Sequence, residues 1–166
     1  MPNWCEGNIR FRGAQKNIRR FLTNEIVCCR YENHETVEER PIIQDKDYLL
    51  IIRKPDEHGW FWIRNTHRNF LDGDMLEIWL DEEDPDRETI VCIEGFKAAW
   101  GFERHDGWPE HARKYEMDVK MTGYDCGMLF SHVKTISRDG TVKETICEYE
   151  NSADWMWNCP RPNNGG

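Results

Sequence analysis

Near the start of the chain is an alternating run of eight residues, Cys5-Glu6-Gly7-Asn8-Ile9-Arg10-Phe11-Arg12. Small or apolar residues alternate with polar ones in this run, and this period of two predicts a half-exposed strand over residues 3–12. Gly13 ends the run. Apolar residues then recur at helical spacing, at Ile18, Phe21, Leu22 and Ile26. The chain therefore opens with a strand and a helix near residues 14–26.

Similar patterns continue in the second half of the chain. They predict strands at residues 89–96, 117–123, 128–137 and 141–149, and a helix near 109–116. The dipeptide Asp139-Gly140 separates the last two strands and is typical of a hairpin turn. Short turns between strands and few helices favour an antiparallel sheet with two helices on one face, which is an α+β fold.

The middle of the chain has a different composition. Residues 27–46 are polar and predict irregular structure, and strands are expected at 48–53, 60–64 and 75–80. The stretch Asp81–Glu88 holds six carboxylates in eight residues, which predicts an exposed loop. We therefore expect one domain over residues 1–160, a strand-rich acidic insertion at about 27–88, and a disordered tail over 161–166.

Three short segments carry a family resemblance. They are Pro2-Asn3-Trp4-Cys5-Glu6-Gly7-Asn8, Phe96-Lys97-Ala98-Ala99-Trp100 and Tyr124-Asp125-Cys126-Gly127-Met128-Leu129-Phe130. Over residues 1–26 and 95–145 the chain resembles the YubB-type ferredoxin-like proteins of phages and plasmids. It departs from their pattern at Ala98, where threonine is usual, and at Gly101-Phe102-Glu103, which replaces a proline-rich stretch. The resemblance implies a ferredoxin-like core and a mobile-element origin, and it transfers no catalytic residue.

The composition of the chain excludes several classes of function. The chain has 166 residues and a formal net charge of −9, and residues 31–90 alone carry −10. This balance argues against direct nucleic-acid binding by charge alone. The start of the chain lacks a signal sequence, and no apolar run approaches the roughly 20 residues of a membrane helix. The seven cysteines are odd in number and contain no C-x-x-C pair, so we expect reduced thiols, no metal or cofactor, and the cytoplasm of a bacterial host.

Candidate catalytic motifs are weak. His34-Glu35-Thr36 matches one half of a two-histidine phosphoesterase pattern, but His132-Val133-Lys134 lacks the hydroxyl of the other half. Cys126 lies in a glycine-flanked turn, where strand reversal explains the glycines. The sequence therefore predicts a protein that is not an enzyme.

The first functional hypothesis is an acidic inhibitor. The loop could present phosphate-like charge to a basic cleft of a host defence factor, such as a CRISPR effector or another defence nuclease. Tryptophans that share one face of the strand at 60–64 would hold the complex, and Trp155-Met156-Trp157 repeats their spacing. Whether these tryptophan pairs are interface or core stays open. The predicted partner-binding residues are Asp81, Glu82, Glu83, Asp84, Asp86, Glu88, Trp60 and Trp62.

The alternative is a small module that binds single-stranded nucleic acid. Arg10 and Arg12 lie on the polar face of the first strand, and an open sheet can accept single strands by aromatic stacking. Exposed aromatic rings beside these arginines would favour this hypothesis. The first strand itself carries none on that face, which ranks the alternative second.

Overall fold

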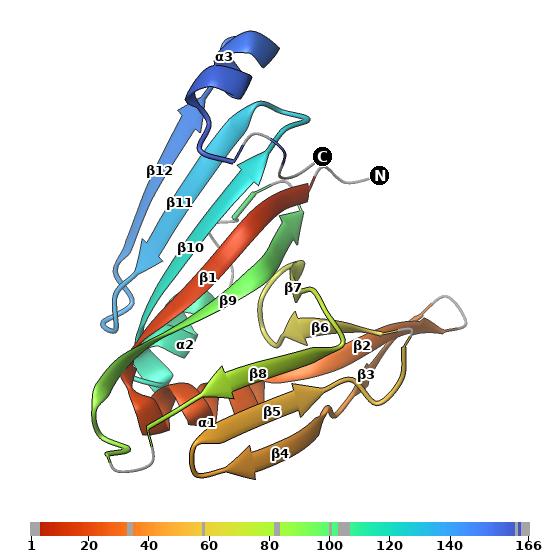
Figure 1. The fold of residues 1–166 in the computed structure, drawn as a ribbon, viewed down its shortest axis with the longest axis vertical. Coiled ribbons are helices and arrows are strands. Elements are labelled where there is room, and N and C mark those ends of the chain that lie inside the picture. Colours follow the sequence, from red (N-terminus) through yellow and green to blue (C-terminus); the bar gives the residue numbers. More distant parts are fainter. Residues whose placement is uncertain are drawn as a thin grey trace.

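A nine-stranded antiparallel sheet organises the chain (Figure 1). The computed structural model describes residues 4–32, 35–57, 59–81, 84–99, 101–102, 107–161 and 163. The strand order is β12 (Val142–Glu148), β11 (Phe130–Ile136), β10 (Asp118–Asp125), β1 (Trp4–Ala14), β9 (Glu88–Ala99), β7 (Asn69–Leu71), β6 (Trp60–Ile63), β2 (Ile26–Glu32) and β3 (Glu35–Glu39). A second sheet has the order β4 (Ile42–Lys46), β5 (Leu49–Arg53) and β8 (Met75–Trp79).

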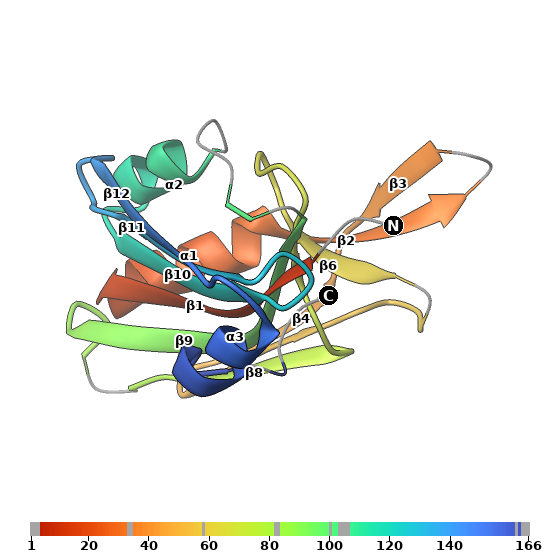
Figure 2. The same cartoon turned by 90° about the horizontal axis from the view of Figure 1, so that it is seen from above.

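Three helices accompany the sheets, namely α1 (Gln15–Glu25), α2 (Trp108–Lys114) and α3 (Ser152–Asn158). Figure 2 shows α1 and α2 on one face of the large sheet and α3 on the other. We call the face that carries α1 and α2 the helix face. The opposite face, on which Arg10 of β1 and Lys120 of β10 lie side by side, is called the open face.

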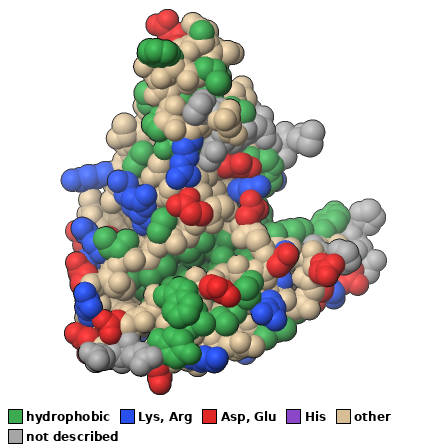
Figure 3. Space-filling view, in the orientation of Figure 1, with side chains coloured by type: hydrophobic (Ala, Val, Ile, Leu, Met, Phe, Trp, Pro, Cys, Tyr) green, Lys and Arg blue, Asp and Glu red, His purple; other side chains and the backbone are tan. Residues whose placement is uncertain are grey.

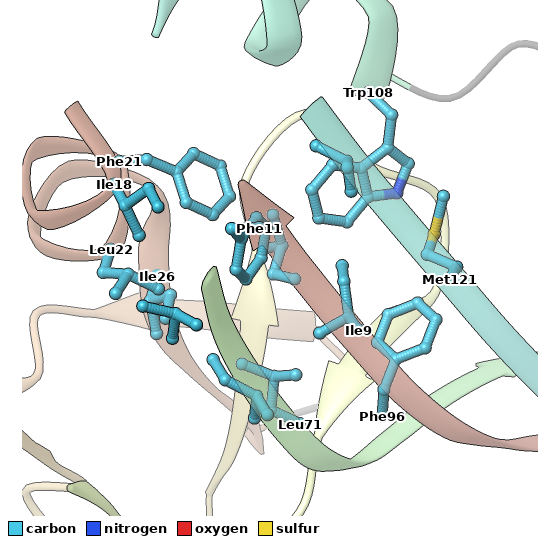
Figure 4. Packing of buried hydrophobic residues seen from close by; sticks show 14 of the residues in the cluster. Ile9, Phe11, Ile18, Phe21, Leu22, Ile26, Leu71, Phe96, Trp108 and Met121 are labelled. Atoms are coloured by element: carbon cyan, nitrogen blue, oxygen red, sulfur yellow. The ribbon is translucent and has the colours of Figure 1, made fainter. Parts of the chain in front are cut away.

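The core forms where the helix face of β1 meets the two helices. Ile9 and Phe11 point into it and are fully buried, whereas the neighbouring Arg10 and Arg12 are exposed, so the predicted alternation is confirmed. Phe21 of α1 packs 4.9 Å from the ring of Phe11 (Figure 4). These rings pack α1 against β1, which lies in the interior of the sheet between β10 and β9.

The helix α2 follows the signals in its sequence. A proline stands in its first turn, where the missing backbone N–H costs no hydrogen bond. Trp108, Ala112 and Tyr115 share its buried side, as their spacing predicts. The Trp108 ring lies 6.0 Å from that of Phe21, so α2 packs on the same core as α1.

The prediction of a ferredoxin-like α+β fold with two helices is wrong. Among the described residues, 53% are in strands and only 17% in helices, and there are three helices. The strands predicted at 3–12, 89–96, 117–123, 128–137 and 141–149 do share one sheet, as β1, β9, β10, β11 and β12. The residues predicted to form an insertion also contribute β2, β3, β6 and β7 to that same sheet, which changes the class of the fold.

The expectation of irregular structure at 27–46 is also wrong. This stretch forms most of β2 and all of β3 and β4. β4 is exposed at every position, and β3 is buried at none, so neither has the alternation that indicates a strand. Backbone pairing with β2 and with β5 places them instead. Strands expected at 48–53, 60–64 and 75–80 are present as β5, β6 and β8.

The two C-terminal tryptophans do not have the expected arrangement. Trp155 and Trp157 were expected to share a face, but they lie in α3, where residues two apart point in nearly opposite directions. Trp155 is 2% exposed and packs with Tyr124 and Tyr149 on the open face, whereas Trp157 is 88% exposed. Most of the expected tail lies outside the described residues. No helix in the described part of the chain combines the length and apolar character needed to span a membrane.

Candidate functional site

A row of three cations crosses the open face. Arg10 of β1 pairs with Lys120 of β10, Lys120 pairs with Thr135 of β11, and Thr135 pairs with Lys143 of β12. Directly paired residues of antiparallel strands point to the same face, so the three cations lie in one line across four strands. All three are exposed, and no hydrogen bond or ion pair to another described residue holds their side chains. Their charge therefore faces solvent uncompensated.

Two further arginines border this row and are held by carboxylates. Arg12 binds Asp118 at 2.8 Å, and Arg138 binds Asp118 at 3.1 Å and Glu88 at 3.0 Å. Partial burial raises the pKa of Asp118, but hydrogen bonds from Arg138 and Arg12 outweigh it and lower the pKa to about 2. This network fixes Arg12 beside the row and leaves five cations against two carboxylates in this region.

The replacement Asp118→Asn tests the network. We expect it to lower the free energy of unfolding at pH 7 by about 1–2 kcal/mol, since solvent screens the two partly exposed arginines. The pKa of Asp118 is depressed in the folded state, so its contribution is full above the ordinary value near 3.8 and is lost as the pH falls towards 2. Urea titrations should show wild type and variant converging over that interval. Asp47→Asn, at an exposed position, is the control, and an equal change in both variants would contradict the account.

Two adjoining hollows lie next to the cations. The first, of about 310 Å³, is lined by Arg10, Arg12 and Lys120, with Ile90 at its border. The second, of about 490 Å³, shares Arg12 and Ile90 with the first and contains Trp79. Three carboxylates also line these hollows, and each is paired with an arginine: Asp118 in the first, and Asp81 and Glu88 in the second. The two hollows thus form one continuous surface of cationic, apolar and ion-paired acidic side chains. Figure 3 shows Lys and Arg side chains over the strands around β1 and hydrophobic ones below them, over β8 and β5.

Trp79 is the most exposed aromatic residue at this surface. Its side chain is 69% exposed, and its ring stacks on Tyr48 with centroids 6.0 Å apart and planes 27° apart. Ile90, directly opposite Arg12, is 64% exposed. An indole held by a neighbouring ring and open to solvent on its other side can accept a further flat ring by stacking. The aromatic neighbour that β1 lacks is therefore supplied by β8.

Three carboxylates of the predicted acidic site are paired with cations of the same chain. Asp81 binds Arg87 at 2.7 Å, Asp86 binds Lys16, and Glu88 binds Arg138. Asp84, the remaining described carboxylate of the loop, accepts the backbone N–H of Asp86. Glu82 and Glu83 lie outside the described residues. Because its charges are paired locally, the loop presents less negative potential than its composition indicates.

The predicted tryptophans lie far from that loop. Phe61 and Ile63 are fully buried while Trp60 and Trp62 are half-buried, which confirms the predicted division of β6 into a core side and a partly exposed side. Trp60 packs edge-on against Phe70 of β7, with centroids 5.9 Å apart. Phe70 pairs with Lys97 near the end of β9, whereas the acidic loop leads into Glu88 at its start. Nine residues of β9, roughly 30 Å of extended strand, separate the two sets.

The weaker candidates find no supporting geometry. His34 lies outside the described residues. Cys126 follows β10 in a turn where Asp125 accepts the N–H groups of Gly127 and Met128, which gives the turn a structural explanation. All seven cysteines are free thiols. The described residues contain no group of three or more His, Cys, Asp or Glu side chains placed to hold a metal ion.

Comparison with known proteins adds no identification: no family model, curated protein or solved structure matches the chain. The resemblance to YubB-type proteins therefore stays a prediction. Sequence reasoning identified Arg10 and Arg12 but missed Lys120, Lys143 and Trp79. The alternation of 117–123 could have placed Lys120 on the exposed side, but its alignment with Arg10 depends on strand order and register.

Proposed function

We propose that the chain is a non-catalytic binding protein whose open face takes up single-stranded nucleic acid. The observation that carries the proposal is the row formed by Arg10, Lys120 and Lys143, which has no carboxylate partner among the described residues. In the acidic loop, by contrast, Asp81, Asp86 and Glu88 each have a cationic partner. A row of free cations on a strand surface supplies the contacts that phosphate groups require.

Single strands fit this surface better than a duplex. Proteins without sequence preference bind single strands by combining a cationic track with aromatic rings on which bases stack. Here the track adjoins Trp79 through the two hollows that share Arg12 and Ile90. Reading the bases of a duplex requires a helix or a two-stranded ribbon that enters the groove. The cation row lies instead on the face of a sheet.

The acidic net charge is compatible with this function because it is unevenly distributed. Residues 31–90 carry −10, whereas residues 1–30 carry +4. The cations of the row come from β1, β10 and β12, outside the acidic segment. Acidic surfaces elsewhere repel phosphate groups and so direct a strand to the open face.

The acidic-inhibitor hypothesis stays a prediction with less support. It requires free negative charge on the loop, and Asp81, Asp86 and Glu88 are paired with cations. A mobile-element origin and action on a host defence factor are compatible with either hypothesis. The experiment that separates them is direct binding of nucleic acid by the purified protein.

Trp79→Ala tests the stacking part of the proposal. We expect the Kd for a labelled oligothymidylate of about 16 nucleotides to rise about tenfold, because a stacked base contributes roughly 1–3 kcal/mol. Trp157→Ala removes a more exposed indole on α3 and is the matched control, with no change expected. Fluorescence anisotropy at low salt gives both constants. If wild type and Trp79→Ala bind equally, or if a duplex of the same length binds more tightly than the single strand, the proposal is wrong.

A further inference from the structure

A second concave site lies on the helix face, away from the cation row. It is a hollow of about 480 Å³ between the C-terminal ends of α1 and α2, the start of β2, the β3–β4 connection and the end of β6. Four cationic side chains line it, one from each surrounding segment except β2. They are Arg20, Arg40, Arg64 and Lys114.

The carboxylate in the hollow, that of Glu25, already has hydrogen-bond donors within the chain. Glu25 is almost fully buried, and its Oε1 accepts hydrogen bonds from the Tyr115 hydroxyl at 2.5 Å and from the Lys114 ammonium at 2.7 Å. Burial raises the pKa of Glu25, but these two hydrogen bonds outweigh it and lower the pKa below its ordinary value. Glu25 is therefore ionised at neutral pH and neutralises Lys114, while Tyr115 is held in place at the wall.

Arg64 also has partners within the chain. Its guanidinium pairs with Glu38 and donates to the carbonyl of Asn24 at 3.2 Å, and its backbone N–H donates to the carbonyl of Glu25 at 2.8 Å. The carbonyl groups of Asn24 and Glu25, the last two residues of α1, thus have hydrogen-bond donors.

Arg20 and Arg40 are uncommitted. No hydrogen bond or ion pair to a described residue holds either side chain, and the Arg20 guanidinium lies over the Tyr115 ring, 5.9 Å from its centroid. Glu25 and Glu38 neutralise the charges of Lys114 and Arg64. The positive charges of the two remaining arginines in the hollow are therefore not neutralised by these carboxylates. Such a site attracts a doubly charged anion, and guanidinium groups match phosphate oxygens in pairs.

We propose that this hollow binds a phosphate dianion, either inorganic phosphate or the phosphate group of a small monoester. Arg20 and Arg40 contact the phosphate oxygens directly. The apolar part of the wall, which includes Ile26, Val27 and Pro41, leaves room for a small organic group in a volume typical of ligand pockets. The site is independent of the open face, because α1 lies behind the large sheet (Figure 2).

Isothermal titration calorimetry of the full chain tests the proposal with inorganic phosphate and with glucose 6-phosphate, each at constant ionic strength. We expect saturable binding of at least one probe, weakened about tenfold or more in Arg20→Gln/Arg40→Gln. Binding of inorganic phosphate alone assigns the site to the free ion, and tighter binding of the ester assigns it to monoesters.

The matched control is Arg53→Gln on β5, which removes an exposed arginine outside the hollow and should bind as wild type does. Arg40→Gln alone, which removes one exposed and unpaired side chain, serves as a milder variant whose fold is checked by its urea midpoint. Absence of saturable binding of both probes to wild type overturns the proposal. Equal affinity of wild type and the double variant overturns it too.

Discussion

Phe21→Ala is expected to lower the free energy of unfolding by about 3–5 kcal/mol, the usual cost of truncating a fully buried phenylalanine. The Phe21 ring is fully buried and connects three elements. It lies 4.9 Å from Phe11 of β1, 6.0 Å from Trp108 of α2 and 5.5 Å from Tyr115 at the end of α2. Removing it leaves a cavity at the point where β1, α1 and α2 meet, and rigid neighbours on three sides limit collapse.

Urea denaturation followed by tryptophan fluorescence measures this effect. Lys16→Ala on the same helix is the control. It removes an exposed side chain paired with Asp86, and we expect a change within about 0.5 kcal/mol. A loss of less than about 1 kcal/mol for Phe21→Ala would show that the two helices do not depend on this contact.

Neutralising the cation row should weaken nucleic-acid binding about 100-fold at low salt. The variant is Arg10→Gln/Lys120→Gln/Lys143→Gln, in which three phosphate contacts of about 1 kcal/mol each are lost. The fold should be retained, because these side chains are exposed and make no ion pair with other described residues. Anisotropy with the same oligothymidylate gives the Kd.

The matched control changes the net charge by the same amount on the helix face. Arg20→Gln/Arg40→Gln/Arg113→Gln also removes three exposed cations. This control is compared with wild type at about 0.1 M salt, where the Debye length is about 10 Å. We expect its Kd to stay within about threefold of wild type there, because charges farther than this from the bound strand are screened. If both triple variants lose affinity equally, binding follows net charge and is not located on the open face.

Much of the large sheet could be predicted from local signals. The alternation in β1 and in the strand at 117–123 reflects one side facing the core. The hairpin between β11 and β12 follows from Asp139-Gly140, since Gly140 adopts a positive φ of 85° and the N–H of Ser137 donates to the carbonyl of Thr141 at 2.9 Å. These signals lie within a few residues of each other.

The remainder of the fold depends on contacts distant in sequence. β7 has only three residues and is too short to carry a pattern, yet it joins β9 to β6 and so brings the middle segment into the large sheet. β3 and β4 have no buried side to reveal them. One missed element did carry a local signal. Asn151 accepts the N–H groups of Ala153 and Asp154 and so caps α3, which an Asn followed by an acidic residue three positions later indicates.

The candidate site shows the same division. Strand alternation places Arg10 and Arg12 on the exposed side of β1, and a single sequence suffices for that. The row needs the order β12-β11-β10-β1, which aligns Lys143 and Lys120 with Arg10. The high charge density of the acidic loop can be read from the sequence. Its ion pairs with Lys16, Arg87 and Arg138 can be seen only in the folded structure.

The salt dependence of oligothymidylate binding shows whether the cations of the open face bind phosphate groups. Each phosphate neutralised on a single strand contributes about −0.7 to the slope of log K against log salt concentration. We expect Arg10→Gln/Lys120→Gln/Lys143→Gln to flatten the wild-type slope by about 2, and the helix-face triple variant to leave it unchanged. Equal slopes for wild type and the open-face variant would contradict the claim that this row of cations binds the phosphate groups.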